Sequence, residues 1–411
     1  MTKGEWWRHE PVVRRFVSDL IAGELARLRP TGLAAPASPF DRTLSLTDEL
    51  GVDSLELVSI AGTLNEILHL HESGVEDRLL MQRRVGEWTE IAIEGLSVYS
   101  ASMTFRTSGS MGRPTRCEHR VADLYDEVTE LSALFPGRTR VLSAVRSHHI
   151  YGFLFTVALP NVLGVPPSAV IDVGNTLPSS WPARLRDGDL VIGYPEFWRA
   201  MVQSHARIPS GVQGVTSTAP CPDEVAREVM QLGLMQLVQV YGSTETAGVG
   251  VRTSADDPFG LLRYWRRSEE REGDLVRMSS DGSTSTRSVP DIIAWADDRH
   301  FRPLRRVDDI VQVGGVNVSL SAVRDALLEH PLVREAAVRL MSAESGNRLK
   351  AFVVPNDAVA DLASLHLALD AWCTTRLPGV QRPRAVTFGN ALPINALGKL
   401  ADWPVLEADP G

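Results

Sequence analysis

Beyond Gly95, short runs of strand-forming residues alternate with amphipathic stretches, and this alternation restricts the possible fold more than any other feature. Strand-like runs occupy Arg140–Val145, Asp189–Tyr194 and Leu237–Tyr241, and the second is followed by the amphipathic stretch Pro195–Gln203. Such alternation predicts an α/β domain with a largely parallel sheet. In such sheets the loops that leave the carboxyl ends of the strands usually hold the ligand. We therefore look for functional residues in those loops.

The segment before this alternation has a different residue pattern. Residues from about Glu10 to Gly95 have few strand signals and read as helical, with a Pro/Ala/Ser-rich loop from Pro30 to Pro39. Asp53 and Glu56 have the spacing of a helix N-cap and its N3 partner. Apolar residues then recur at helical spacing, namely Leu57, Ile60, Ala61, Leu64 and Leu68. These signals predict a helix that begins near Ser54.

A third unit follows from Asp308, with a strand signal at Leu349–Val354 and a helix signal at Asp361–Leu377. A chain of 411 residues is long enough for two or three domains. We expect a helical domain at 1–97, an α/β core at 98–307 and a small C-terminal domain at 308–411.

The composition excludes several classes of protein. The net charge is -9, from 42 basic and 51 acidic residues, and a general nucleic-acid binder needs a basic surface instead. The three cysteines, Cys117, Cys221 and Cys373, show no pairing pattern, which favours a reduced compartment. No apolar stretch is long enough to span a bilayer, and the N-terminus lacks the apolar run of a signal peptide. We expect a cytoplasmic protein with neither nucleic acid nor a membrane as its partner.

One loop carries the features of a phosphate-binding turn. It is rich in glycine and hydroxyl groups and reads Thr107-Ser108-Gly109-Ser110-Met111-Gly112-Arg113-Pro114. Small residues let backbone N–H groups approach phosphate oxygens, and hydroxyls add further donors. A flexible surface turn is the alternative.

A second polar segment directly follows the strand signal that ends near Val240. It reads Tyr241-Gly242-Ser243-Thr244-Glu245-Thr246. A carboxylate beside hydroxyls at the end of a strand could hold Mg²⁺ against a nucleotide, since Mg²⁺ prefers a few hard oxygens plus phosphate. The alternative is a polar loop that caps the next helix.

A third candidate is Lys399, which follows Gly398 near the C-terminus. A lysine on a tight glycine-containing turn can neutralise charge that develops on a phosphate or a carboxylate. Most lysines are only solvated, so Lys399 indicates a function only together with the other two segments.

In this order the three segments resemble the adenylate-forming (ANL) superfamily of acyl-CoA synthetases, aryl acid ligases and peptide-synthetase adenylation domains. The resemblance covers roughly Thr104 to Trp403. It implies that ATP and Mg²⁺ are bound, that Thr107 to Gly112 grip phosphates, and that Tyr241, Gly242 and Ser243 contact the nucleotide. It also implies catalytic roles for Thr244, for Glu245 as the Mg²⁺ ligand, and for Lys399.

Weaker elements of the family pattern lie between these segments. Ser147 to Gly152 is similar to the HxxG segment of the family, with His149 lining the acid pocket. Ser217 to Pro222, including Ala219 and Pro220, looks like the stretch that packs on adenine. Asp291 stands where the family places the aspartate that binds ribose. By the same resemblance Arg306 is a catalytic residue that meets phosphate, and Asp308 is the hinge of a mobile C-terminal domain.

The chain departs from the family pattern at several positions. Thr115 replaces the usual lysine after the phosphate loop, Pro290 and Arg305 replace glycines, and Gln312 replaces a common lysine. The long region that usually precedes the phosphate loop is missing, and the helical segment stands in its place. These changes weaken the expected phosphate and pantetheine contacts.

The stretch Leu50 to Glu56 resembles the phosphopantetheine attachment site of acyl carrier proteins, where a serine at the start of a helix takes the thiol arm. The resemblance makes Ser54 a candidate site for 4'-phosphopantetheine. The alternative is that Asp53 and Ser54 only cap a helix.

The resulting interpretation is an α/β protein with a truncated adenylate-forming large domain, a small mobile α+β C-terminal domain and a preceding helical bundle like a carrier protein. His148, His149 and Tyr151 occupy a position where amino-acid-activating relatives place an aspartate, which favours an aryl acid. The architecture resembles 3-hydroxybenzoate:acyl carrier protein ligases of aryl-polyene (xanthomonadin) pigment synthesis. We therefore expect a hydroxybenzoate to be activated as acyl-AMP and passed to an acyl carrier protein, in trans or in cis. Free coenzyme A as the acceptor, and a non-catalytic nucleotide-binding scaffold, are the alternatives.

Overall fold

The structure is a computed structural model. It describes residues 4–29, 38–106, 115–174, 176, 180–271, 273–306, 309–313, 316–342, 348–357, 359, 361–394 and 400–405. Contacts divide the chain into two compact units, one of Met1–Val289 with Trp295–Arg302 and one of Pro290–Ala294 with Pro303–Gly411. The helical segment and most of the α/β core thus share one unit. The limits 1–97, 98–307 and 308–411 remain a prediction.

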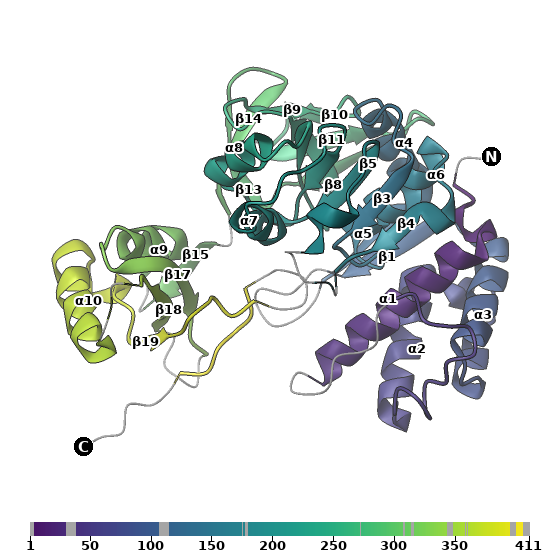
Figure 1. Cartoon of the computed structure of the whole chain (residues 1–411), viewed down its shortest axis with the longest axis horizontal. Coiled ribbons are helices and arrows are strands. Elements are labelled where there is room, and N and C mark those ends of the chain that lie inside the picture. Colours follow the sequence, from purple (N-terminus) through teal and green to yellow (C-terminus); the bar gives the residue numbers. More distant parts are fainter. Residues whose placement is uncertain are drawn as a thin grey trace. The chain divides into compact units, whose positions relative to one another are not determined.

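Three helices build the N-terminal segment: α1 (Glu10–Leu28), α2 (Ser54–Leu68) and α3 (Val85–Val98), with short 3-10 turns at Trp6–Arg8, Leu70–Glu72 and Glu76–Met81. Figure 1 shows the three helices side by side. The predicted start of α2 is confirmed, because the Asp53 carboxylate accepts the backbone N–H groups of Leu55 and Glu56. The Glu56 carboxylate accepts the N–H of Asp53 and completes a capping box. The five apolar residues predicted for its inner face are buried.

Strands of the first unit build most of a nine-stranded sheet with the order β13-β14-β9-β8-β7-β6-β5-β3-β4, while most of β13 and the end of β14 belong to the second unit. The parallel strands are β3 (Arg140–Ser143), β4 (Val170–Asp172), β5 (Asp189–Gly193), β6 (Gln213–Thr216) and β7 (Gln236–Ser243). The antiparallel strands are β8 (Ala247–Arg252), β9 (Phe259–Leu261) and β14 (His300–Arg306), and β13 (Asp291–Trp295) lies at the edge. The prediction of a largely parallel sheet therefore holds for only half of it, because a tight hairpin joins β7 to β8.

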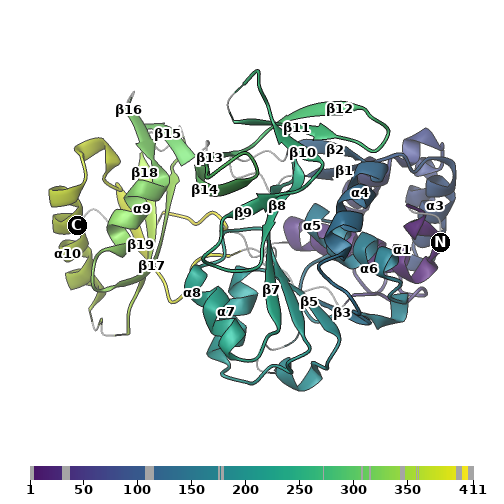
Figure 2. The same ribbon diagram turned by 90° about the horizontal axis from the view of Figure 1, so that it is seen from above.

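Helices cover both faces of this sheet (Figure 2). One layer contains α4 (Val121–Ser132), α5 (Ile150–Phe153) and α6 (Leu159–Leu163), with a π-helical segment at Leu154–Ala158 between the last two. The other layer contains α7 (Pro195–Gln203) and α8 (Asp223–Gln231). Short 3-10 turns lie at Pro167–Ala169 and Pro182–Arg184. None of the described helices combines the length and the apolar character needed to cross a membrane.

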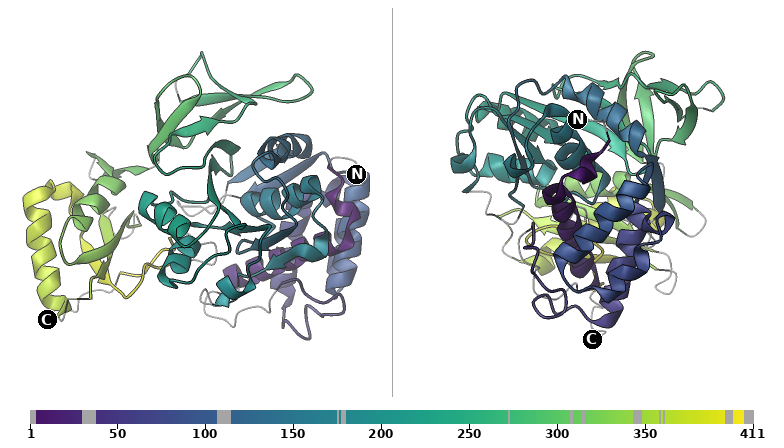
Figure 3. Two further views of the ribbon diagram at one scale, coloured as in Figure 1. Left: turned by 45° about the horizontal axis from the view of Figure 1, so that its top comes forward. Right: turned by 90° about the vertical axis from the view of Figure 1, so that its right-hand side faces the viewer.

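Two smaller sheets complete the unit. Strands β1 (Ser102–Arg106) and β2 (Arg116–Arg120) form an antiparallel hairpin. Strands β10 (Trp265–Arg267), β11 (Asp274–Met278) and β12 (Thr284–Ser288) form a separate antiparallel sheet, which Figure 3 shows in green at the margin of the unit. The phosphate-loop residues Thr107 to Gly112 lie outside the described residues, and their neighbours on both sides belong to the β1–β2 hairpin.

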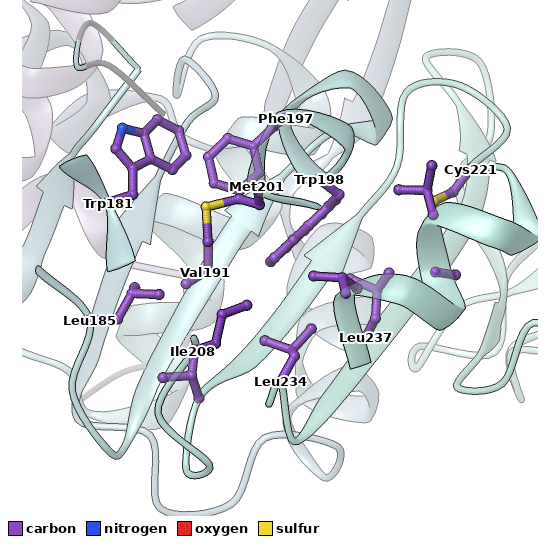
Figure 4. Packing of buried hydrophobic residues seen from close by; sticks show 14 of the residues in the cluster. Trp181, Leu185, Val191, Phe197, Trp198, Met201, Ile208, Cys221, Leu234 and Leu237 are labelled. Atoms are coloured by element: carbon purple, nitrogen blue, oxygen red, sulfur yellow. The ribbon is translucent and has the colours of Figure 1, made fainter. Parts of the chain in front are cut away.

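Large apolar side chains fill the space between the sheet and the layer of α7 and α8. Trp181, Phe197, Trp198 and Met201 pack against Val191 of β5, as Figure 4 shows. Trp198 is fully buried, and its indole N–H donates to the carbonyl oxygen of Val215. This packing fixes β5 and β6, whose carboxyl ends lead into the loops discussed below.

The second unit has an α+β core. Its elements are β15 (Ile310–Val313), β16 (Val316–Ser319), α9 (Leu320–Leu328), β17 (Val333–Leu340), β18 (Leu349–Pro355), α10 (Leu362–Arg376), a 3-10 turn at Gly379–Gln381 and β19 (Ala385–Phe388). Strands β17, β18 and β19 form one sheet, and β15 pairs with β16. The strand predicted at Leu349–Val354 and the helix predicted at Asp361–Leu377 are confirmed, with Asp361 as the N-cap of α10.

Candidate active site

Three of the predicted segments leave the same edge of the nine-stranded sheet. Ser147 to Gly152 follows β3, Ser217 to Pro222 follows β6, and Tyr241 to Thr246 covers the end of β7 and the turn after it. The three strands run parallel, so their carboxyl ends lie at one edge. The structure thus brings the HxxG-like segment, the adenine-like segment and the Glu245 loop to the edge where such sheets bind ligands.

The loop that carries Glu245 is the turn of the β7–β8 hairpin. Ser243 pairs with Ala247, and the hydroxyls of Ser243 and Thr246 lie 3.0 Å apart. Gly242 is required here, because a Cβ at this position would lie 2.1 Å from the carbonyl oxygen of Ala247. The next element is a strand, so the alternative of a loop that caps a helix does not apply. Glu245 is half-buried at the tip of the turn.

The donor set of this turn fits Mg²⁺ bound together with a nucleotide. It offers the Glu245 carboxylate beside the hydroxyls of Ser243 and Thr244. Mg²⁺ is usually held by one or two carboxylates plus substrate phosphates, with water completing its shell. Among the described residues, no group of three or more His, Cys, Asp and Glu side chains could hold a metal ion.

His119 on β2 contacts the backbone of this turn. Its Nε2 lies 2.7 Å from the carbonyl oxygen of Thr244. Burial lowers the pKa of His119 to about 4, so the ring is neutral at pH 7. A carbonyl only accepts, so Nε2 carries the proton and donates it. His119 therefore couples the Glu245 turn to the hairpin whose loop is the predicted phosphate grip.

Glu127 on α4 holds the start of β8. Both carboxylate oxygens lie within hydrogen-bond reach of the N–H of Gly248, at 3.0 and 3.1 Å. Burial raises the pKa of Glu127 to about 7. A Cβ on Gly248 would lie 2.4 Å from Oε1 of Glu127, so glycine is needed for this approach. Sequence reasoning missed Glu127, although its place on the apolar side of an amphipathic helix was a signal.

Tyr241 and Cys117 complete the surroundings of the turn. The Tyr241 ring contacts the rings of Phe259 and Phe301, with centroid distances of 5.8 and 5.3 Å. Cys117 is buried on β2, and burial, aided by the charge of Glu245, raises the pKa of its thiol to about 11. Cys117 is therefore a packing residue.

The adenine-like segment is accessible at two of its residues. Ala219 and Pro220 are exposed, whereas Thr216 at the end of β6 is 1% exposed. The exposed pair is therefore available for packing on a ring.

The HxxG-like segment is tightly constrained. A Cβ on Gly152 would lie 1.9 Å from the carbonyl oxygen of Arg146, so only glycine fits. The Tyr151 hydroxyl donates to the carbonyl of Gly193 at the end of β5, at 2.9 Å. The rings of His148 and His149 lie 4.0 Å apart, and His148 is buried. These contacts fix His149 at the start of α5.

Helix α1 of the N-terminal segment reaches this same constellation. The Asp19 carboxylate accepts the backbone N–H of Ser147 at 2.8 Å and its hydroxyl at 2.5 Å. Gly23 faces His148 so closely that a Cβ would lie 2.7 Å from the imidazole. Trp6 and Phe16 pack against the Phe153 ring. The helical segment is thus a structural support of the HxxG-like segment.

Arg15 adds a further contact. Its guanidinium donates to the carbonyl oxygen of Thr156 in the π-helical segment. In an α-helix this carbonyl would accept from the residue four positions later, which is Pro160 and has no N–H. Arg15 donates to this carbonyl from helix α1.

Helix α2 holds the two strands that border the predicted phosphate loop. Oε1 of Glu66 lies 2.6 Å from the guanidinium of Arg106 on β1, and Oε2 lies 2.6 Å from that of Arg116 on β2. His69 contacts the hydroxyl of Thr104 at 2.9 Å. Arg116 follows Thr115, the residue that replaces the usual lysine. The charge of Arg116 is paired with Glu66 of the helical segment.

Several predicted residues cannot be placed in this constellation. Thr107 to Gly112, Asp308 and Lys399 lie outside the described residues. Arg306 ends β14, and only its backbone is described. Asp291 begins β13 and belongs to the second unit. Their roles remain predictions.

The fold and this edge define an α/β protein with a ligand-binding edge, and comparison with known protein families identifies its class. The family model described as AMP-binding enzyme matches residues 100–267. The model described as AMP-binding enzyme C-terminal domain matches residues 323–399.

Relatives match along nearly the whole chain. A 4-coumarate–CoA ligase of Halorhodospira halophila is 38% identical over 398 residues, which cover 94% of this chain and 98% of the relative. A 4-coumarate–CoA ligase of Cereibacter sphaeroides is 38% identical over 384 residues, 92% of this chain and 89% of the relative. The chain belongs to the AMP-binding enzyme family of adenylate-forming acid–thiol ligases.

Solved structures show the same fold. The o-succinylbenzoate coenzyme A synthetase of Bacillus subtilis in complex with AMP superimposes with a TM-score of 0.56 at 18% identity, over 79% of this chain and 72% of that one. Membership of the AMP-binding enzyme family, shown by the family models and the relatives, makes ATP-dependent formation of an acyl-AMP the reaction class of this protein, with an organic acid as its substrate.

Proposed function

We propose that this protein joins a hydroxycinnamic acid such as 4-coumarate to free coenzyme A through an acyl-AMP intermediate. The observation that carries the proposal is the match to proteins named 4-coumarate–CoA ligase. Because 94% of the 411 residues align, only about 25 residues lie outside the match, and most of 1–97 lies within it. The helical segment is thus shared with proteins that are named for coenzyme A as the acceptor.

The contacts of α1 support coenzyme A over a carrier arm in cis. A carrier domain delivers its thiol by moving, but here Arg15 is 7% and Asp19 5% exposed, and both bond to the α/β core. Undocking would break these hydrogen bonds and expose the rings of Trp6, Phe16 and Phe153, which pack together at this contact, so it would cost free energy. A fixed helical segment fits an enzyme whose thiol arrives from solution.

In the proposed reaction a carboxylate oxygen of the acid attacks the α-phosphate of MgATP and pyrophosphate leaves. The coenzyme A thiol then attacks the acyl carbon, the bond from carbon to the phosphate oxygen breaks, AMP leaves, and the thiol proton is released. Glu245 and Thr244 hold the nucleotide and Mg²⁺, and His149 borders the acid.

The remaining parts of the proposed mechanism come from the family pattern. Thr107 to Gly112 and Arg306 bind phosphate oxygens, and Asp291 binds ribose. Lys399 stabilises the charge of the first step, and rotation about Asp308 then withdraws it.

A second candidate is transfer of a hydroxybenzoate, such as 3-hydroxybenzoate, to an acyl carrier protein. The head of α2 favours it: Ser54 is exposed at the first turn, and Leu55 and Val58 beside it are 83% and 56% exposed. Exposed apolar side chains at such a place suit contact with another protein. The contacts of α1 do not oppose a carrier that acts in trans.

The experiment is pyrophosphate release with MgATP across cinnamic, hydroxycinnamic, benzoic, hydroxybenzoic, fatty and amino acids, followed by thioester formation. We expect the highest kcat/KM with a hydroxycinnamate and a thioester with free coenzyme A. A hydroxybenzoate optimum, with thioester formed only on a phosphopantetheinylated carrier, would replace this proposal with the second candidate. If ATP binds but no acid in the panel causes pyrophosphate release, the protein would be a non-catalytic nucleotide-binding scaffold.

Two variants test the assigned residues. Lys399→Ala should lower adenylation by roughly two to three powers of ten, the usual loss of one preorganised charge stabiliser. Intact mass after expression beside a phosphopantetheinyl transferase should stay at the unmodified value if coenzyme A is the acceptor. A mass increase that Ser54→Ala abolishes would support a carrier in cis.

A further inference from the structure

We infer that Thr218 is a specificity-determining residue whose hydroxyl donates a hydrogen bond to an acceptor oxygen of the acyl-AMP. The inference deepens the proposed function, since it assumes that an acyl-AMP forms at this edge of the sheet. It rests on the backbone of Thr218, on its hydroxyl, and on its place in the fold.

The backbone of Thr218 adopts a conformation that threonine rarely takes. Its φ is +79°, in the left-handed region, where a side chain branched at Cβ is strongly disfavoured. Outside glycine, the other described residues with positive φ are His69, His205 and Ala247, and none is branched at Cβ. Strain of this kind persists where the surroundings impose it, and it clusters at ligand sites.

The hydroxyl of Thr218 is enclosed but has no hydrogen-bond partner within the described part of the chain. The same holds for the hydroxyl of Thr216, two residues earlier, which is 1% exposed. A buried hydroxyl without a partner destabilises the fold, so such groups are usually satisfied by protein, water or ligand. Two of them at the end of one strand leave donors available to a ligand.

The place of Thr218 identifies that ligand. It follows β6, and the neighbouring strands β5 and β7 lead into Tyr194 and the Glu245 turn at the same edge. The next residues, Ala219 and Pro220, are exposed, so the loop is accessible. The acyl-AMP carries acceptor oxygens on both of its halves, the acyl carbonyl and the phosphate. A donor hydroxyl at this edge suits either oxygen.

Three substitutions separate the hydroxyl from the strain. Thr218→Val keeps the branched shape and removes the hydroxyl, Thr218→Ser keeps the hydroxyl, and Thr218→Gly removes both hydroxyl and strain. The control is His205→Gly, which relieves a positive φ of 52° at an exposed position after α7.

We expect Thr218→Val to lower kcat/KM about tenfold, the effect of one hydrogen bond to a charged or reacting group, and Thr218→Ser to retain most of it. Thr218→Gly and His205→Gly should both raise the apparent Tm by roughly 1–3 °C, but only Thr218→Gly should lose activity. A loss confined to the KM of the acid places the acceptor on the acyl half, and a loss confined to the KM of ATP places it on the nucleotide.

Wild-type kinetic constants for both substrates in Thr218→Val would overturn the inference. So would a Thr218→Gly variant that gains stability and keeps full activity, since the strain would then serve no ligand. Failure of the proposed function looks different, because the wild type itself would then release no pyrophosphate. In that case the affinities of wild type and Thr218→Val for a non-hydrolysable acyl-AMP analogue decide the role of Thr218, and equal affinities reject it.

Discussion

Two parts of the N-terminal helical segment meet their surroundings in opposite ways. Along α1, Arg15 and Asp19 are buried and bond to the α/β core. At the head of α2, Ser54 is exposed and Leu55 is 83% exposed. Both parts belong to one helical bundle, yet only the first is tied to the candidate active site. One helical bundle can therefore be anchored to the α/β core along one helix and be exposed at the head of another.

Of the variants that test this difference between α1 and α2, Asp19→Ala should change the stability most. The N–H and hydroxyl of Ser147 would lose their buried acceptor, so the free energy of unfolding should fall by about 3 kcal/mol. The KM for the acid should rise, because the segment that carries His149 is no longer held. Denaturant unfolding and steady-state kinetics measure the two effects.

Asp53→Ala at the head of α2 is the matched control. It removes a helix N-cap and should cost only about 1 kcal/mol, without a change in KM. Equal losses in the two variants would show that the two parts of the segment do not differ.

The next effect is a dependence of the free energy of unfolding on pH, caused by His148, which is buried against α1. Burial, aided by the charge of Arg146, lowers the pKa of His148 to about 3. Because this pKa is lower in the folded than in the unfolded state, His148 supports the fold fully above about pH 6.5 and opposes it as pH falls below that value. The slope is about 1.4 kcal/mol per pH unit, or roughly 2 kcal/mol at pH 5.

His148→Gln should flatten the fall in the free energy of unfolding between pH 6.5 and 5, measured by denaturant titration at each pH. His119, with a pKa of about 4, contributes a similar slope, so the difference between wild type and variant isolates His148. Parallel pH profiles for the two proteins would contradict the assignment.

Two glycines of the bundle sharpen the comparison. A Cβ on Gly23 in α1 would lie 2.7 Å from His148, whereas nothing lies within 4 Å of a Cβ on Gly62 in α2. Gly62→Ala should stabilise the protein by about 0.5–1 kcal/mol through helix propensity. Gly23→Ala should destabilise it by about 1–2 kcal/mol, because overpacking exceeds the same gain. Thermal unfolding of both variants tests the signs, and a stabilised Gly23→Ala would refute the close approach of α1.

The smallest effect is expected for Leu55→Ala at the exposed head of α2. The side chain loses almost no buried area, so the free energy of unfolding should stay within about 0.5 kcal/mol of wild type. With free coenzyme A as the acceptor, kcat/KM should also stay unchanged. A specific loss of transfer to an acyl carrier protein would instead mark this surface as a docking site.

The features predictable from sequence were those with a local pattern. The start of α2 was found through its capping box, and α7 was found at Pro195–Gln203, because caps and periodicity involve residues a few positions apart. The Glu245 loop was found because it follows a strand signal, whereas the segments Ser147 to Gly152 and Ser217 to Pro222 were found through the resemblance to the family. The antiparallel half of the sheet was missed, since the turn at Glu245 has no typical hairpin sequence.

The support by α1 was also missed, for a different physical reason. Asp19 and Ser147 are 128 positions apart, and no periodicity links a helix residue to a distant loop. Arg15 and Thr156 are 141 positions apart, and only the fold reveals that the guanidinium donates to this carbonyl. Long-range polar contacts of this kind need coordinates.

The burial of all three cysteines has a practical consequence. Cys117, Cys221 and Cys373 are enclosed, and burial raises the pKa of each thiol, to about 11 for the first and about 12 for the second. Near neutral pH almost no reactive thiolate is present. A cysteine placed at Ser54 would therefore take up a fluorophore alone, and the environment of the helical bundle could be followed during turnover without first removing native thiols.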